Sequence, residues 1–244
     1  MLNKTEDKLH GSDSLFSRFQ DYLGEFVYGG IDGCVTTFAV VAGAAGAGLD
    51  SAIVIILGFA NLFADGFAMS VGAYLSCKSE RDNYEKHKRI EYWEVENMVG
   101  KEIDEVRDIF KEKGFEGDLL DKVVNVIISD KDRWVETMMR DELQMLPSSK
   151  NPFTVGGMTF ISFLTVGFIP LFIYVLDYLF GLDNVNLFVY SSVLTFFAFC
   201  IIGFLKSYVN ETARVKGILE TVLLGGIAAT VAYVVGDILE KIVK

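Results

Sequence analysis

Five long runs of apolar residues are separated by polar segments along this chain. Residues 26–49 contain one charged side chain, Asp32, and residues 52–77 contain one, Asp65. Three further runs contain none: residues 152–176, 185–205 and 221–236. About 20 apolar helical residues cross the ~30 Å hydrocarbon core of a bilayer, and these continuous runs lack the alternation of barrel strands. The pattern therefore predicts an all-α polytopic membrane protein with five transmembrane helices.

The polar segments complete the predicted organisation. Residues 1–25 form an N-terminal segment, residues 26–77 the first two transmembrane helices, residues 78–151 a hydrophilic insert, and residues 152–244 the last three helices. The N-terminal segment lacks the basic start and cleavage site of a signal peptide. Its apolar residues recur at helical spacing and predict an amphipathic surface helix. They are Leu15, Phe16, Phe19, Tyr22, Leu23 and Phe26.

The insert is predicted to be a small domain of three helices. The second apolar run continues past Cys77 without Gly or Pro until Gly100, so we expect one long helix that leaves the membrane. A second helix is predicted over residues 101–113, with Gly114 as its C-cap. A third is predicted over residues 118–146.

The distribution of basic residues predicts the orientation. Of the 22 Lys and Arg residues, three precede the first run, 14 lie in the insert and three lie between the fourth and fifth runs. With five transmembrane helices, these three segments share one side of the membrane. The positive-inside rule then places the N-terminus and the insert in the cytoplasm and the C-terminus on the opposite side.

Charge and composition narrow the chemistry. The net charge is −11, and the insert holds 19 acidic against 14 basic residues, which disfavours nucleic acid as a partner and suits cations. The three cysteines show no CxxC spacing, so neither a disulfide framework nor a thiolate zinc site is indicated. With two histidines in the chain, metal binding would depend on carboxylates and thioethers.

The insert carries candidate metal ligands at helical spacing. Glu91 and Glu94 are three residues apart and share a helix face, as do Glu102 and Glu105. The third helix adds Met138, Met139 and Glu142. Oxygen and thioether donors together favour Fe²⁺, Mn²⁺, Co²⁺ or Zn²⁺ over Mg²⁺ and Ca²⁺. The alternative is a solvated acidic helix face with Met138 and Met139 in a hydrophobic core.

Two charged residues lie within the apolar runs. An ionised Asp at the centre of a transmembrane helix costs roughly 2.5–3.5 kcal/mol, so such residues usually face a pathway or a partner. Asp65 and Met69 are four residues apart and offer an oxygen and a sulfur on one helix face. The alternatives are an interfacial position for Asp32, a hydrogen bond to a neighbouring helix for Asp65, and packing for Met69.

Small residues line the first apolar run. Gly29 and Gly33 form a GxxxG pair, which lets helix backbones approach closely. The close approach could be to another helix of the chain or to a second copy across a dimer axis.

Together these features resemble the vacuolar iron transporter family, including bacterial-type members with a cytoplasmic metal-binding domain. The resemblance runs from about Glu25 to the C-terminus. Its most specific parts are Gly-Gly-Ile-Asp-Gly at residues 29–33, the stretch from Asn61 through Asp65 to Met69, and Met-Met-Arg-Asp-Glu-Leu at residues 138–143.

The resemblance implies a homodimer that moves Fe²⁺, and often Mn²⁺, out of the cytosol in exchange for protons. It implies no permanently bound cofactor, because the ions are substrate or regulatory ions. Asp32 and Met69 match residues of the family's transmembrane route. The matching ligands of its cytoplasmic domain are Glu91, Glu94, Glu102, Glu105, Met138, Met139 and Glu142. Asn61 stands where some relatives carry a carboxylate, which leaves the number of protons exchanged open.

Two other functions compete with transport. A membrane-anchored metal sensor or buffer would bind metal in the insert alone, and Asp32 and Met69 would then be dispensable. A di-iron enzyme in the membrane would be expected to pair Glu-x-x-His motifs, and neither His10 nor His87 stands in one. The sequence therefore favours a non-enzymatic metal transporter.

Overall fold

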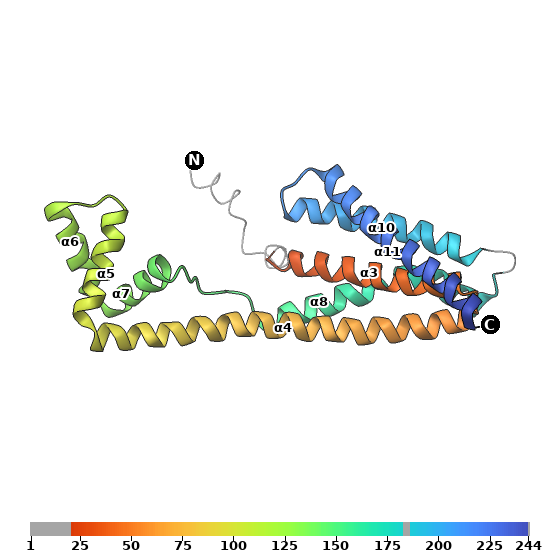
Figure 1. Cartoon of the computed structure of the whole chain (residues 1–244), viewed down its shortest axis with the longest axis horizontal. Helices are drawn as coiled ribbons and strands as arrows, with labels where there is room; N and C mark the ends of the chain where they lie inside the picture. Colours follow the sequence, from red (N-terminus) through yellow and green to blue (C-terminus); the bar gives the residue numbers. More distant parts are fainter. Residues whose placement is uncertain (1–20, 183–185, 244) are drawn as a thin grey trace, which may run out of the picture. The chain divides into compact units, whose positions relative to one another are not determined.

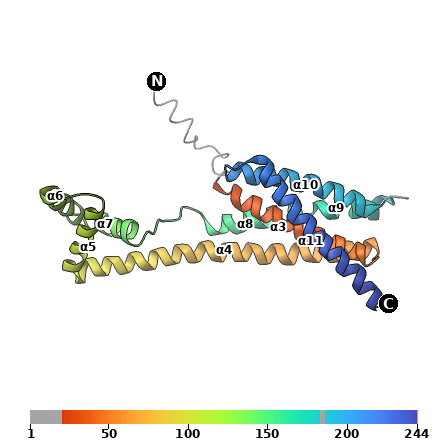
Figure 2. The ribbon, with the colours of Figure 1, turned by 45° about the horizontal axis from the view of Figure 1, so that its top comes forward.

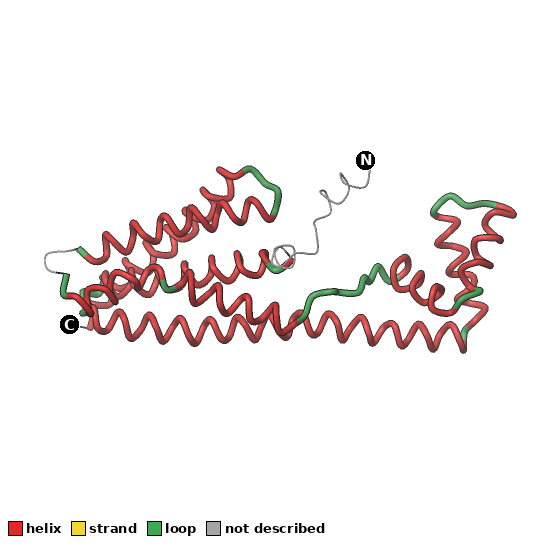
Figure 3. Tube along the Cα trace, turned by 180° about the vertical axis from the view of Figure 1, so that it is seen from behind, coloured by secondary structure: helices red, strands yellow, loops and turns green. Residues whose placement is uncertain are grey.

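The structure is a computed structural model that describes residues 21–182 and 186–243. These residues form helices joined by short connections, and none of them forms a β-strand, so the all-α prediction is confirmed (Figure 3). The chain divides into two compact units. We call Met1–Tyr74 with Lys150–Lys244 the apolar unit and Leu75–Ser149 the polar unit. The predicted N-terminal surface helix lies largely outside the described residues.

The apolar unit is built around helix α3 (Leu23–Gly46), which packs on α8, α9, α10 and α11 (Figures 1 and 2). The bounds of these helices are α8 Pro152–Gly167, α9 Ile169–Phe180, α10 Leu187–Val209 and α11 Arg214–Val243. The first half of α4 (Ser51–Asn97) completes the unit. Within residues 21–182 and 186–243, four helices are long and apolar enough to cross a membrane, and α8 with α9 would make a fifth span if the bent pair counts as one.

Glycines let α3 lie close to its neighbours. A Cβ atom on Gly33 would lie 2.5 Å from the carbonyl oxygen of Phe163 on α8, and one on Gly29 would lie 2.7 Å from that of Thr159. At the other end of α3, Gly46 meets the backbone of Tyr233 on α11. Contacts this close need residues without side chains, as is usual between membrane helices. The GxxxG pair therefore serves packing within the chain.

The run predicted as one span over residues 152–176 is bent. Helices α8 and α9 meet at 52°, and Pro170 lies in the first turn of α9. Proline supplies no backbone N–H and crowds the preceding turn, which explains the break. The hydroxyl of Ser191 on α10 donates to the Pro170 carbonyl at 2.6 Å, so this carbonyl at the bend is satisfied from a neighbouring helix.

The polar unit has a hydrophobic core of its own. The second half of α4 is followed by α5 (Val99–Glu112), α6 (Gly117–Ile128), α7 (Lys131–Thr137) and a π-helical turn, η1 (Met138–Glu142). Their buried side chains form one cluster: Val95, Val106, Leu120, Val124, Trp134, Val135, Met138 and Met139.

The single helix predicted over residues 118–146 is wrong. Helix α6 ends at Ile128. Asp130 is the N-cap of α7, because its side chain accepts a hydrogen bond from the backbone N–H of Arg133 at 2.8 Å. An N-cap of this kind competes with continuation of the preceding helix. The long α4 and the turn at Gly114, which has φ +91°, agree with the sequence prediction.

Candidate metal-binding sites

Three elements of the polar unit carry the predicted cytoplasmic ligands. Helix α4 carries Glu91 and Glu94, and α5 carries Glu102 and Glu105. The π-turn η1 carries the remaining three: Met138, Met139 and Glu142. A short π-helical turn widens a helix by one residue and is frequent at functional sites. Here its hydrogen bond runs from Leu143 N–H to the Met138 carbonyl at 3.1 Å.

One carboxylate of each pair is buried. Glu91 is 3% exposed and Glu102 is 1% exposed. In the described part of the chain, the Oε2 atom of each has no hydrogen-bond partner. Each unsatisfied buried polar group costs about 1–3 kcal/mol, so these two oxygens are candidates to bind a cation.

The acidic side chains of the three elements influence one another. Burial, followed by repulsion from Glu142, Glu94 and Glu105, raises the pKa of Glu91 to about 7. Burial, followed by repulsion from Glu105, Glu91 and Glu94, raises the pKa of Glu102 to about 7. We call these five residues the carboxylate cluster. Its mutual repulsion is the electrostatic condition under which a divalent cation binds well.

A lysine that the sequence analysis did not identify belongs to this region. The ammonium of Lys101 lies 2.7 Å from Glu105 Oε1, and its positive charge offsets part of the rise that burial causes in the pKa values of Glu91 and Glu142. The spacing of four residues between Lys101 and Glu105 was the signal available in the sequence. Lys101 is therefore a fixed positive charge that a metal ion would have to compete with.

The two methionines are packed in the hydrophobic core. Met138 is fully buried and Met139 is 1% exposed, and both contact the apolar residues of the polar unit. This is the packing role that the alternative interpretation assigned to them. Over residues 21–182 and 186–243, no group of three carboxylate, imidazole or thiol side chains is positioned to enclose a metal ion. Closing the carboxylate cluster around an ion thus requires side-chain movement.

Polar contacts hold η1 and α7 in place. Lys113, which directly follows α5, donates to Asp141 on η1 at 2.6 Å, and Tyr92 on α4 donates to Asp132 on α7 at 2.7 Å. Lys131 pairs with Glu96 beside the second contact. The elements that carry the carboxylate cluster are thus fixed by contacts that do not use its members.

The apolar unit brings together two of the predicted route residues. Asp32 on α3 is half-buried, and Asp65 on α4 acts on it electrostatically. Met69 packs beside a buried cluster that includes Leu62 and Phe163. The charges of Asp32 and Asp65 are thus close enough to influence each other, and Met69 lies among apolar residues.

Two further polar atoms in this region lack partners. The Thr37 hydroxyl on α3 and the Asn61 amide nitrogen on α4 are buried, and no hydrogen bond reaches either within the described residues. Asn61 lies one turn before Asp65, and Thr37 one turn after Gly33. Thr37 was not predicted as a site residue, because a threonine in an apolar helix usually bonds to its own backbone.

The fold and these sites define a helical membrane protein with carboxylates both in its apolar helices and in its polar unit. The chain matches the VIT family over residues 23–237, and it belongs to that family. It is 35% identical to a protein named vacuolar iron transporter from Toxoplasma gondii, covering 91% of this chain and 76% of the relative. It is 32% identical to the vacuolar iron transporter of Plasmodium berghei, covering 91% and 83%. It is 31% identical to vacuolar iron transporter 1 of Arabidopsis thaliana, covering 90% and 87%.

Proposed function

We propose that this protein transports divalent metal, Fe²⁺ and also Mn²⁺, out of the cytosol in exchange for protons. The observation that carries the proposal is the pair of buried carboxylates, Glu91 and Glu102, each with one oxygen that has no partner among the described residues. Membership of the VIT family and the relatives named as iron transporters support metal as the substrate.

The proposed topology has five spans, with α8 and α9 forming one bent span. The N-terminus and the polar unit face the cytosol, because 20 of the 22 basic residues then share that side. The family resemblance supports a homodimer. Membrane lipid is the third partner, beside metal ions and protons.

The polar unit and the apolar unit would have different roles in transport. The carboxylate cluster collects cytosolic metal, with Met138 and Met139 as neighbouring soft donors. Asp32 and Asp65 then offer negative charge to an ion that has lost its water, and Met69 offers a thioether. A carboxylate cannot hold a metal ion and a proton at once, so release of the ion favours proton uptake. Zn²⁺ and Co²⁺ suit the same donors.

Transport is tested by metal uptake into proteoliposomes that contain the purified protein and a metal-sensitive dye. With an imposed pH gradient, we expect Fe²⁺ uptake to rise and to be accompanied by proton movement in the opposite direction. Protein-free liposomes measure the leak. Metal binding without any flux above that leak would contradict transport and would support the sensor or buffer function.

Metal collection by the polar unit can be tested separately, because this unit has its own hydrophobic core. The double variant Glu102→Gln/Glu105→Gln should lower the Mn²⁺ affinity of residues 75–149 by roughly 10-fold or more, since it removes two negative charges at the site. The measurement is calorimetric titration.

The matched control is Asp104→Asn/Asp108→Asn, which removes the same charge from exposed positions of the same helix, α5. We expect its affinity to stay within about twofold of the parent, since exposed charges are screened. Equal losses in the two variants would mean that the polar unit attracts cations through its overall charge.

A further inference from the structure

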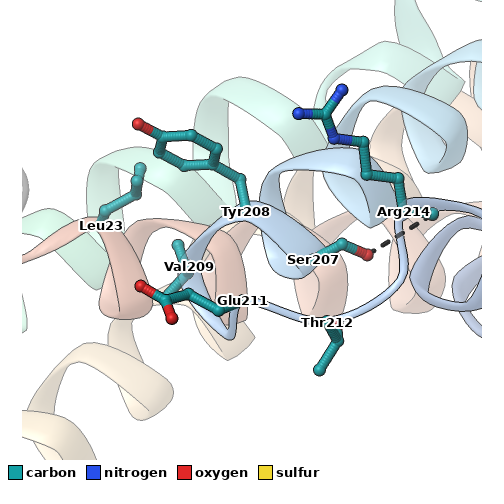
Figure 4. A pocket seen from close by; sticks show the side chains of 7 residues that line it. All are labelled: Leu23, Ser207, Tyr208, Val209, Glu211, Thr212 and Arg214. Atoms are coloured by element: carbon teal, nitrogen blue, oxygen red, sulfur yellow. Dashed lines mark hydrogen bonds between the residues drawn. The ribbon is translucent and has the colours of Figure 1, made fainter.

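A cavity lies where the connection between α10 and α11 meets the start of α3. Its volume is about 460 Å³. Leu23 and Val209 give it an apolar wall, and Tyr208, Thr212, Glu211 and Arg214 give it polar groups (Figure 4). The buried hydroxyl of Ser207 holds the connection together by donating to the carbonyl oxygens of Gly203, at 3.0 Å, and of Arg214, at 3.4 Å.

Among the described residues, no carboxylate forms a salt bridge with Arg214. The two neighbouring lysines, Lys206 and Lys216, lie 3.0 Å and 4.0 Å from the same carboxylate, Glu220. Arg214 instead lies over the ring of Phe204, at 5.4 Å from the ring centre, and forms no salt bridge within the described residues. A guanidinium that lines a cavity without an acidic partner is a ready site for an anion.

The backbone adds positive potential at the same place. Arg214 is the first residue of α11, a helix of 30 residues. The first N–H groups of a helix have no acceptor within it, and the helix dipole is positive there. The Arg214 side chain and the helix end thus favour the same sign of ligand charge.

The remaining lining residues limit the kind of anion. Figure 4 shows the Arg214 guanidinium on the same side of the connection as the Tyr208 ring, whereas the Glu211 carboxylate extends to the other side. The acid makes a polyphosphate unfavourable. The apolar wall at Leu23 and Val209 suits the hydrocarbon part of a ligand beside its charged group.

We propose that this cavity binds a phosphate group of low charge, presented by an anionic phospholipid or by a soluble phosphate. The cavity is formed at the shared end of two apolar helices, where a lipid headgroup would lie beside it. The occupant would join the start of α3 to the α10–α11 connection, and α3 carries Asp32. This inference does not depend on metal transport.

The test uses the full-length protein in detergent, with thermal unfolding as the readout. The added probes are phosphatidylglycerol, phosphatidylcholine and inorganic phosphate. We expect phosphatidylglycerol at saturation to raise the unfolding midpoint by roughly 3–8 °C more than phosphatidylcholine does. Inorganic phosphate that reproduces the rise would assign the site to a soluble phosphate.

Arg214→Gln should lose at least half of this rise, and Arg214→Lys should retain part of it. Lys216→Gln is the matched control, because it removes one positive charge from the same first turn of α11 but does not line the cavity. It should keep the full rise. Equal losses in the Gln variants would mean diffuse attraction and would overturn the proposal, as would a wild-type protein that responds alike to all three probes. If Arg214→Gln does not fold, the comparison of Arg214→Lys with Lys216→Gln decides.

Discussion

Replacing Asp32 by Asn should reduce metal flux in proteoliposomes by roughly 100-fold or more. The substitution keeps size and hydrogen bonding but removes the negative charge that offsets the cost of dehydrating the ion. At an effective dielectric constant of 20, a unit charge pair 4 Å apart gains about 4 kcal/mol, which corresponds to almost three orders of magnitude. The measurement is initial Fe²⁺ uptake at a fixed pH gradient, with dye-reported proton movement in parallel.

The matched control is Asp237→Asn on α11. It removes the same charge within the apolar unit, but Asp237 is partly exposed and paired with Lys241 at 2.7 Å, and such pairs contribute little. Its flux should match the wild type, and metal binding by the polar unit should be unchanged in both variants. Wild-type flux in Asp32→Asn would remove Asp32 from the route and favour the sensor or buffer.

The apolar pattern predicts the helices well but not where they bend. Proline is tolerated in membrane helices, so Pro170 inside a run without charges did not reveal the 52° break between α8 and α9. The break at Asp130 had a sequence signal, an N-cap residue, which the continuing hydrophobic face on both sides obscured. Both differences arise because the pattern of apolar residues does not show whether a helix continues or is interrupted by a proline or an N-cap residue.

The sequence pattern also predicts the candidate sites only in part. Helical spacing predicts that Glu91 shares a helix face with Glu94, and Glu102 with Glu105. Spacing does not show that one member of each pair is buried, because burial depends on how α4 and α5 pack with η1. Nor does it show that Asp32 and Asp65, on different helices, influence each other.

Burial of the carboxylate cluster shifts the pH at which we expect it to lose metal to higher values. Ordinary carboxylates would lose metal only as the pH falls toward 4–5. Glu91 and Glu102 have pKa values raised to about 7, by burial first and by neighbouring acids second. Metal must displace protons from both, so the affinity of the polar unit should fall roughly 10- to 100-fold between pH 7.5 and pH 6.

The same pKa values predict how stability depends on pH without metal. Between the ordinary carboxylate pKa and about 7, the folded polar unit binds more protons than the unfolded chain. Its stability is therefore highest near the lower limit and is lost as the pH rises through 7. Added Mn²⁺ should restore stability at pH 8, because it replaces the protons at the two buried carboxylates.

Both effects are measured on residues 75–149, by Mn²⁺ titration at a series of pH values and by thermal unfolding with and without metal. Glu91→Gln/Glu102→Gln should bind metal weakly at every pH and should lose the fall in stability between the ordinary carboxylate pKa and about pH 7, because its amides do not titrate. Asp104→Asn/Asp108→Asn should follow the parent in both measurements. An affinity that stays constant from pH 7.5 to pH 6 would mean that Glu91 and Glu102 are already ionised there and do not exchange protons for metal.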